Sequence, residues 1–127
     1  WMKINNIKSL NFQELLENSD IVIIHVPGGS KTPLITKNEL LLMKRDAVLI
    51  NVSRGGVVDE VDLYEFLKQG KIRGAAIDVF SKEPYKGKLS ELKNVILTPH
   101  IASYSIESKL QMEIEATENL INYFKGN

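Results

Sequence analysis

The chain of 127 residues contains no cysteine and no long apolar run. Without cysteine there is no disulfide framework and no thiolate nucleophile, which fits a reducing compartment such as the cytoplasm. Apolar runs such as Ile21 to Ile24 are far shorter than the roughly 20 residues that cross a bilayer. The chain also lacks the basic segment followed by an apolar one that is typical of a secretory signal. We therefore expect a cytoplasmic protein without a membrane segment.

Charge of one sign is also missing, because 16 basic side chains balance 16 acidic ones and form no basic stripe. This balance gives no electrostatic reason to expect nucleic acid as a partner, and favours small molecules or proteins. The two histidines lie far apart, with no carboxylates at ligand spacing, so no metal site is predicted. With 43% apolar residues, the chain can form one small globular domain.

A glycine-rich phosphate-binding turn is absent as well, and no acidic ribose ligand follows a second strand. Trp1 precedes Met2, so the chain starts either with a foreign residue or at the edge of a longer protein. We therefore treat the chain as truncated.

Apolar stretches alternate with amphipathic ones along the chain. Strands are predicted at 21–26, 47–52, 75–80 and 95–98, and the unbroken apolar character of 47–52 is typical of a parallel strand covered on both faces. Helices are predicted after a cap at Asn11, around 40–45, from a cap at Asp59 to a left-handed cap at Gly70, and from about 105 to 124. This alternation predicts an α/β fold with right-handed crossovers in a doubly wound parallel sheet.

The helices should bury one apolar face each. The side chains expected on these faces are Phe12, Leu15, Leu16, Leu40, Leu41, Met43, Val61, Leu63 or Tyr64, Phe66 and Leu67, and Met112 is also assigned to the core.

Three polar residues follow predicted strands, where ligands bind in parallel sheets: Arg54 in INVSRGGVVDE, Glu83 in AAIDVFSKEP and His100 in VILTPHIAS. The guanidinium of Arg54 can hold the carboxylate and carbonyl of a 2-oxo acid. The imidazole of His100 can act as general acid and base, and Glu83 can orient that ring and favour its protonated form. Taken singly, Arg54 also fits a surface turn, Glu83 a solvated loop and His100 a satisfied core position.

In combination, NVSRGGVVDE, AAIDVFSKEP and NVILTPHIA resemble the second half of the nucleotide-binding domain of D-isomer-specific 2-hydroxyacid dehydrogenases, including phosphoglycerate dehydrogenase-like members. The resemblance covers nearly the whole chain, because LNFQELLENSDIVIIHVP is similar to the family's preceding helix and strand. It implies a partial Rossmann-like domain over 1–127, without the glycine-rich first half and the substrate domain. It also implies NAD as cofactor, with NADP not excluded, and a homodimer.

The same resemblance implies residue roles. Arg54, Glu83 and His100 would be catalytic, and the residues expected against the dinucleotide are Val26, Val52, Ser53, Arg54, Asp78, His100, Ile101, Ala102 and Ser103. Asp78 would lie near the nicotinamide carboxamide. Glu83 argues against a formate dehydrogenase, where glutamine is usual, and the phosphoglycerate, glyoxylate or hydroxypyruvate, and lactate classes all stay open.

The sequence also departs from the family pattern. Gly28 and Gly29 replace the usual leucine and threonine after HVP. We expect the strands carrying HVP and INVSRG to be separated by two missing strands, so that the remaining strands do not form one contiguous sheet. Direct pairing of these two strands, swapping between chains or binding of the missing half-domain would close this gap.

The leading hypothesis is an NAD-dependent oxidoreductase that interconverts a D-2-hydroxy acid and its 2-oxo acid. The alternatives are a catalytically silent fragment that works through a protein partner, and a regulatory relative that senses dinucleotide.

Overall fold

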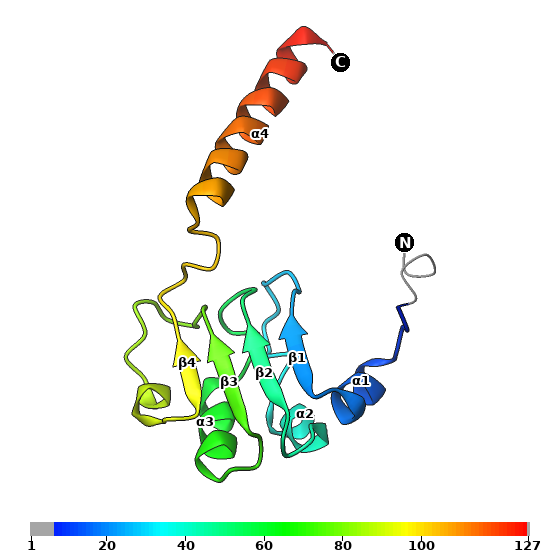
Figure 1. Ribbon diagram of the computed structural model, residues 1–127, viewed down its shortest axis with the longest axis vertical. Coiled ribbons are helices and arrows are strands. Elements are labelled where there is room, and N and C mark those ends of the chain that lie inside the picture. The colour runs from blue at the N-terminus through cyan, green and yellow to red at the C-terminus, as the bar shows by residue number, and fades with distance from the viewer. Residues whose placement is uncertain (1–6, 127) are drawn as a thin grey trace.

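A computed structural model describes residues 7–126 of the chain, and its centre is a parallel sheet of four strands (Figure 1). The elements are α1 (Phe12–Asn18), β1 (Ile21–Ile24), α2 (Lys37–Leu42), β2 (Val48–Asn51), α3 (Glu60–Lys68), β3 (Gly74–Ile77), the 3-10 helix η1 (Lys88–Glu91), β4 (Val95–Leu97) and α4 (Ile106–Lys125). The predicted strands and helices are all present, with strands that end earlier than expected. The α/β fold class is confirmed.

The strands lie in chain order, β1-β2-β3-β4, and every neighbouring pair is parallel. Our expectation of a gap in the sheet is therefore wrong, because Ile21 pairs directly with Val48 and Ile24 with Asn51. Direct pairing was one of the three ways in which we expected the gap to close. The physical reason is the short crossover through α2, which returns the chain beside the strand it has just left.

Helix caps explain where the helices begin. Asn11 and Thr36 each form a capping box at the start of α1 and α2, and the carboxylate of Asp59 accepts from the backbone N–H groups of Val61 and Asp62. Gly70 follows α3 with φ 62°, as predicted for a left-handed cap.

The core lies on one face of the sheet, where α2 and α3 cover it (Figure 1). Leu40, Met43, Leu63, Tyr64, Phe66 and Leu67 are buried there, together with Leu16 of α1. The predictions for Leu41 and Val61 are wrong, since these side chains are 58% and 73% exposed. The predictions for Phe12 and Leu15 of α1 are wrong as well, since they are 43% and 36% exposed.

The opposite face of the sheet is uncovered by residues 7–126. Along β1 the side chains alternate, with Val22 and Ile24 buried while Ile21 and Ile23 are 60% and 52% exposed. The register continues this row across the sheet, from Ile23 to Ile50, then to Ala76 and then to Ile96. Ile96 is 68% exposed. The prediction that 47–52 is covered on both faces is therefore wrong within the described residues.

Helix α4 extends away from the sheet (Figure 1), and none of its residues is buried. Its apolar side chains include Ile106, Leu110 and Phe124, which are 82%, 56% and 78% exposed. Met112, which we assigned to the core, is 52% exposed. No helix within residues 7–126 is both long enough and apolar enough to span a membrane.

Candidate active site

The turn that carries Arg54 is shaped by the buried side chain of Asn51 at the end of β2. The Oδ1 atom of Asn51 accepts from the backbone N–H and the hydroxyl of Ser53, at 3.1 and 2.9 Å, and its Nδ2 donates to the carbonyl of Arg54 at 3.2 Å. Only 1% of Asn51 is exposed, so these hydrogen bonds are shielded from water. One amide therefore fixes the backbone on both sides of the arginine.

Gly55 brings this turn against the loop that leaves β3. A Cβ atom at position 55 would overlap the backbone carbonyl of Phe80, so only glycine allows the two segments to approach so closely. The guanidinium of Arg54 donates from Nη1 to the carbonyl of Ser53 at 2.7 Å. Among residues 7–126 the ion pairs are Lys44 with Asp20 and His100 with Glu83, so no carboxylate of this segment neutralises Arg54.

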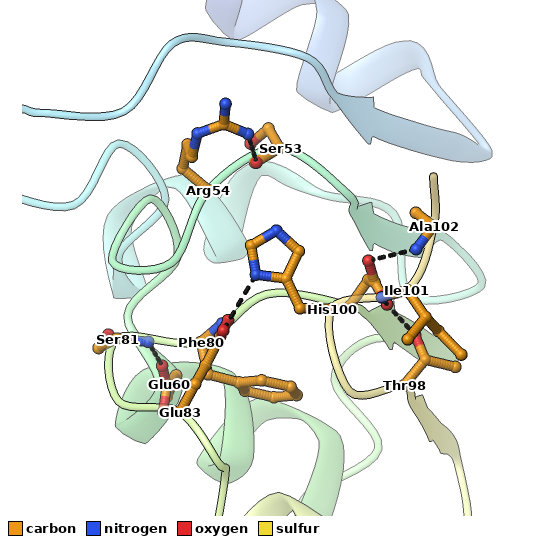
Figure 2. A network of polar contacts seen from close by, with 11 residues as sticks. Ser53, Arg54, Glu60, Phe80, Ser81, Glu83, Thr98, His100, Ile101 and Ala102 are labelled. Atoms are coloured by element: carbon orange, nitrogen blue, oxygen red, sulfur yellow. Dashed lines mark hydrogen bonds and ion pairs between the residues drawn. The ribbon is translucent and has the colours of Figure 1, made fainter. Parts of the chain in front are cut away.

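Glu83 and His100 form a hydrogen-bonded pair at the cavity (Figure 2). The Nδ1 atom of His100 lies 3.0 Å from Oε2 of Glu83, and the backbone N–H of Phe80 donates to Oε1 of Glu83 at 3.0 Å. The Phe80 N–H, and after it the hydrogen bond with His100, lower the pKa of Glu83 below its ordinary value. An ionised carboxylate can only accept, so Nδ1 of the imidazole carries the proton. The other ring nitrogen, Nε2, points away from Glu83 and toward the side where Arg54 lies (Figure 2).

The backbone of His100 adopts the left-handed conformation, with φ 57°. This conformation is uncommon outside glycine, although histidine is among the residues enriched there. It is held by a hydrogen bond of 2.8 Å from the backbone N–H of His100 to the carbonyl of Asp78.

Asp78 anchors the loop that carries His100. Its carboxylate accepts from the hydroxyl of Thr98 and from the backbone N–H groups of Ile101 and Ala102, both at 2.9 Å. Burial acts to raise the pKa of Asp78, but these three hydrogen bonds outweigh it and the pKa is lowered. The carboxylate is therefore ionised and holds the loop, although Asp78 is only 3% exposed.

The structure brings the three predicted catalytic residues together. Arg54, Glu83 and His100 line one cavity of about 610 Å³, with Gly28, Gly29, Gly55, Phe80 and Ser81 as its other walls. The predicted cofactor residues also lie at the carboxyl edge of the sheet. Val26 and Ile101 are 36% and 42% exposed there, Val52 is half-buried, and Ala102 and Ser103 are exposed. Ser53 is buried, and its hydroxyl is engaged with Asn51.

Sequence reasoning missed three polar residues that hold the site in shape. These are Asn51, Thr98 and Glu60, whose Oε1 accepts from the backbone N–H of Ser81 at 2.7 Å. Asn51 has a recognisable signal, since it is the one polar residue in an apolar strand. Glu60 has none, because it lies in the first turn of α3, where acidic residues are common. No cluster of three potential metal ligands occurs within residues 7–126.

A parallel sheet covered by helices, with a polar site at the carboxyl ends of its strands, has the ligand placement of Rossmann-like α/β domains. Residues 2–102 match the family model described as D-isomer specific 2-hydroxyacid dehydrogenase, NAD binding domain. The chain belongs to this family. The predicted family and the predicted cofactor, NAD, are thereby confirmed.

Curated relatives and solved structures agree with this assignment. A glyoxylate reductase of Thermofilum pendens is 47% identical over 126 residues, which cover 97% of this chain and 37% of the relative. A D-3-phosphoglycerate dehydrogenase of Archaeoglobus fulgidus is 41% identical over 94% of this chain and 23% of the relative. An acyclic imino acid reductase, solved with NADPH and D-Arg, is 42% identical with a TM-score of 0.86 over 94% of this chain and 39% of its own. The chain therefore spans well under half the length of these proteins.

The carboxyl edge of the sheet carries groups that suit a dinucleotide. Val26, Val52 and Ile101 offer apolar surface at this edge. The ionised carboxylate of Asp78 lies at the same edge, but the residue is only 3% exposed and its carboxylate already accepts three hydrogen bonds. NADP stays open beside NAD, since the matched imino acid reductase was solved with NADPH.

Proposed function

We propose that this chain supplies the catalytic residues for NAD-dependent interconversion of a D-2-hydroxy acid and its 2-oxo acid. The cofactor, when bound, would accept the hydride as NAD⁺ or supply it as NADH. The observation that carries the proposal is the single cavity shared by an arginine without a carboxylate partner in residues 7–126 and a histidine oriented by an ionised glutamate. This is the arrangement that a small anion with an adjacent carbonyl requires.

Each residue has a distinct part in the proposed reaction. The planar guanidinium of Arg54 binds the substrate carboxylate and polarises the neighbouring carbonyl. Nε2 of His100 gives a proton to the carbonyl oxygen during reduction and takes it back during oxidation. Glu83 stabilises the imidazolium and fixes which ring nitrogen faces the cavity. Asp78 holds the loop that positions His100 and would also accept from the nicotinamide amide.

The names of the relatives favour glyoxylate and phosphohydroxypyruvate, the 2-oxo acid of 3-phosphoglycerate, as first substrates to test, with pyruvate for the lactate class. Hydroxypyruvate is added because the family resemblance leaves it open. We also propose that the complete site needs more than residues 1–127. The uncovered sheet face with Ile21, Ile23 and Ile96 supports association with a second copy or with the missing half-domain.

The proposal is tested by NADH binding and by turnover of these four acids, with Arg54→Ala and His100→Asn as variants. Asparagine is chosen at position 100 because it tolerates the left-handed backbone. We expect His100→Asn to lower kcat by about 10² to 10⁴-fold and Arg54→Ala mainly to raise KM.

Arg45→Ala serves as the matched control for Arg54→Ala, since Arg45 is exposed and does not line the cavity. It should behave like the unaltered chain. Full activity in His100→Asn contradicts the proposal, and so does NADH binding without turnover of any of the four acids when the exposed sheet face is covered by a second copy or by the missing half-domain.

A further inference from the structure

The loop from β1 to α2 reaches the catalytic cavity at Gly28, directly against the side chain of Arg54. A Cβ atom added at position 28 would lie 2.8 Å from Cγ and 2.9 Å from Cβ of Arg54, and 3.7 Å from its Cδ. Carbon atoms that are not bonded to each other normally stay about 3.5 to 4.0 Å apart. A side chain at position 28 and the observed side chain of Arg54 therefore exclude each other.

The contact involves the near end of the arginine, which has little freedom to move. The backbone of Arg54 is fixed by the hydrogen bond from Asn51 to its carbonyl and by the close approach of Gly55 to Phe80. Relief cannot come from a movement of the guanidinium tip alone. A new rotamer of Arg54 would remove the contact with Cγ and lose the 2.7 Å hydrogen bond to the Ser53 carbonyl, but it would leave Cβ in place. The Arg54 turn or the loop at Gly28 must therefore also shift.

We propose that Gly28 is a positioning residue: because it has no side chain, the β1–α2 loop packs against Arg54 in its observed rotamer, and this packing determines where a 2-oxo acid carboxylate binds. The effect on substrate binding rests on the proposed function, whereas the contact between Gly28 and Arg54 does not. It deepens that function by assigning a role to a loop position at which this chain departs from the usual leucine.

The neighbouring glycine supplies a matched comparison. Gly29 has φ 105°, a conformation that strains other residues, yet a Cβ atom there would meet nothing within 4 Å. Gly28 is not among the residues with positive φ, so alanine adds a steric contact there without backbone strain. Gly28→Ala therefore tests the contact with Arg54, and Gly29→Ala tests the backbone alone.

The experiment follows the Nε–Hε signal of Arg54 by NMR in the isotope-labelled chain, assigned by its disappearance in Arg54→Lys. We expect Gly28→Ala to move this signal and to weaken glyoxylate binding about tenfold, which corresponds to one charged hydrogen bond weakened or lost. Gly29→Ala should lower Tm but leave the Arg54 signal in place. An Arg54 signal and a glyoxylate affinity that are both unchanged in Gly28→Ala overturn the inference.

Two further readouts keep this result separate from the proposed function. In the unaltered chain, nuclear Overhauser contacts between Gly28 Hα and the Arg54 Cγ protons should be present, and their absence overturns the inference even if Gly28→Ala does not fold.

In turnover assays, Gly28→Ala should raise KM with little change in kcat. A moved Arg54 signal in a chain that reduces no 2-oxo acid supports the positioning role and contradicts the proposed function. If the unaltered chain and Gly28→Ala turn over a 2-oxo acid with equal KM, the proposed function is supported and the positioning role is contradicted.

Discussion

At the scale of single residues, the site depends on two carboxylates with different tasks. Asp78 is buried and holds a loop through three hydrogen bonds, whereas Glu83 lies at the cavity and orients an imidazole. Both have lowered pKa values, so both are ionised near neutral pH. The first carboxylate gives the loop its shape, and the second directs the proton of His100.

Replacing Asp78 by asparagine should loosen the loop that carries His100. The amide has one acceptor oxygen, and its NH₂ group would face a backbone N–H of Ile101 or Ala102. A donor that faces a donor in a buried position costs about 1 to 3 kcal/mol, and urea unfolding measures this difference. Asp46→Asn is the matched control, because Asp46 is exposed. Equal stability of Asp78→Asn and the unaltered chain would contradict the anchoring role.

The pH dependence of stability should report Glu83. Its folded-state pKa is lowered, so its contribution is present above the pKa of the unfolded chain and is lost as the pH falls through the folded-state value. The difference in Tm between the unaltered chain and Glu83→Gln should therefore be largest near neutral pH and shrink in acid. Thermal unfolding at a series of pH values measures it, with Glu118→Gln as an exposed control. A difference that grows in acid would show that the sign is wrong.

At the scale of elements, the strands end where the site begins, and helix caps fix the spacing between them. The helix α3 starts at Glu60 with its cap at Asp59, only a few residues after Arg54. The bridge between Ile35 and Val58 joins this segment to the end of the β1–α2 loop. Stability of the site and stability of α3 are therefore linked.

Loss of the α3 cap should be measurable. Asp59→Ala removes the acceptor of the Val61 and Asp62 N–H groups and should cost about 1 kcal/mol of unfolding free energy. Urea unfolding measures the cost, and Glu65→Ala on the exposed side of the same helix is the control. If Asp59→Ala and Glu65→Ala unfold at the same urea concentration, the cap contributes nothing.

Sequence reasoning predicted the order of elements and the trio of site residues, because both follow from local patterns. Helix caps depend on short segments of sequence, such as Asn11 before α1 or Asp59 and Gly70 around α3, so they were predicted correctly. The neighbour of each strand is not local, so the pairing of β1 with β2 was predicted wrongly. The hydrogen bond from the Ser81 N–H to Glu60 spans 21 positions, and no local sequence pattern predicts it. The same holds for Gly28, whose contact with Arg54 exists only in three dimensions.

At the scale of the whole molecule, residues 7–126 bury one face of the sheet and leave the other exposed. Ile21, Ile23 and Ile96 lie on the exposed face, and the apolar side of α4 is exposed as well. An apolar sheet face of this kind marks a surface that another segment or chain covers. The predicted homodimer and the predicted association with a missing half-domain both stay predictions, and this face is where each would form.

Light scattering should detect self-association through this face. We expect a mass above the 14.3 kDa of one chain that rises with concentration, since exposed apolar area drives association. Ile23→Lys should return the mass toward that of one chain at little cost in stability, because Ile23 is already half exposed. Ile106→Lys in α4 distinguishes the helix from the sheet. A single-chain mass at all concentrations would contradict self-association.

The position of β4 has a consequence for how activity is lost on heating. This strand has three residues, lies at the edge of the sheet and pairs only with β3 within residues 7–126. Edge segments with few partners open locally before the rest of a domain unfolds. Opening of β4 would carry His100 away from Glu83 while the Arg54 turn on β2 stays folded. The chain should therefore lose proton transfer at a lower temperature than it loses its capacity to bind a carboxylate, and amide exchange at Val95–Leu97 should run ahead of exchange at Val48–Asn51.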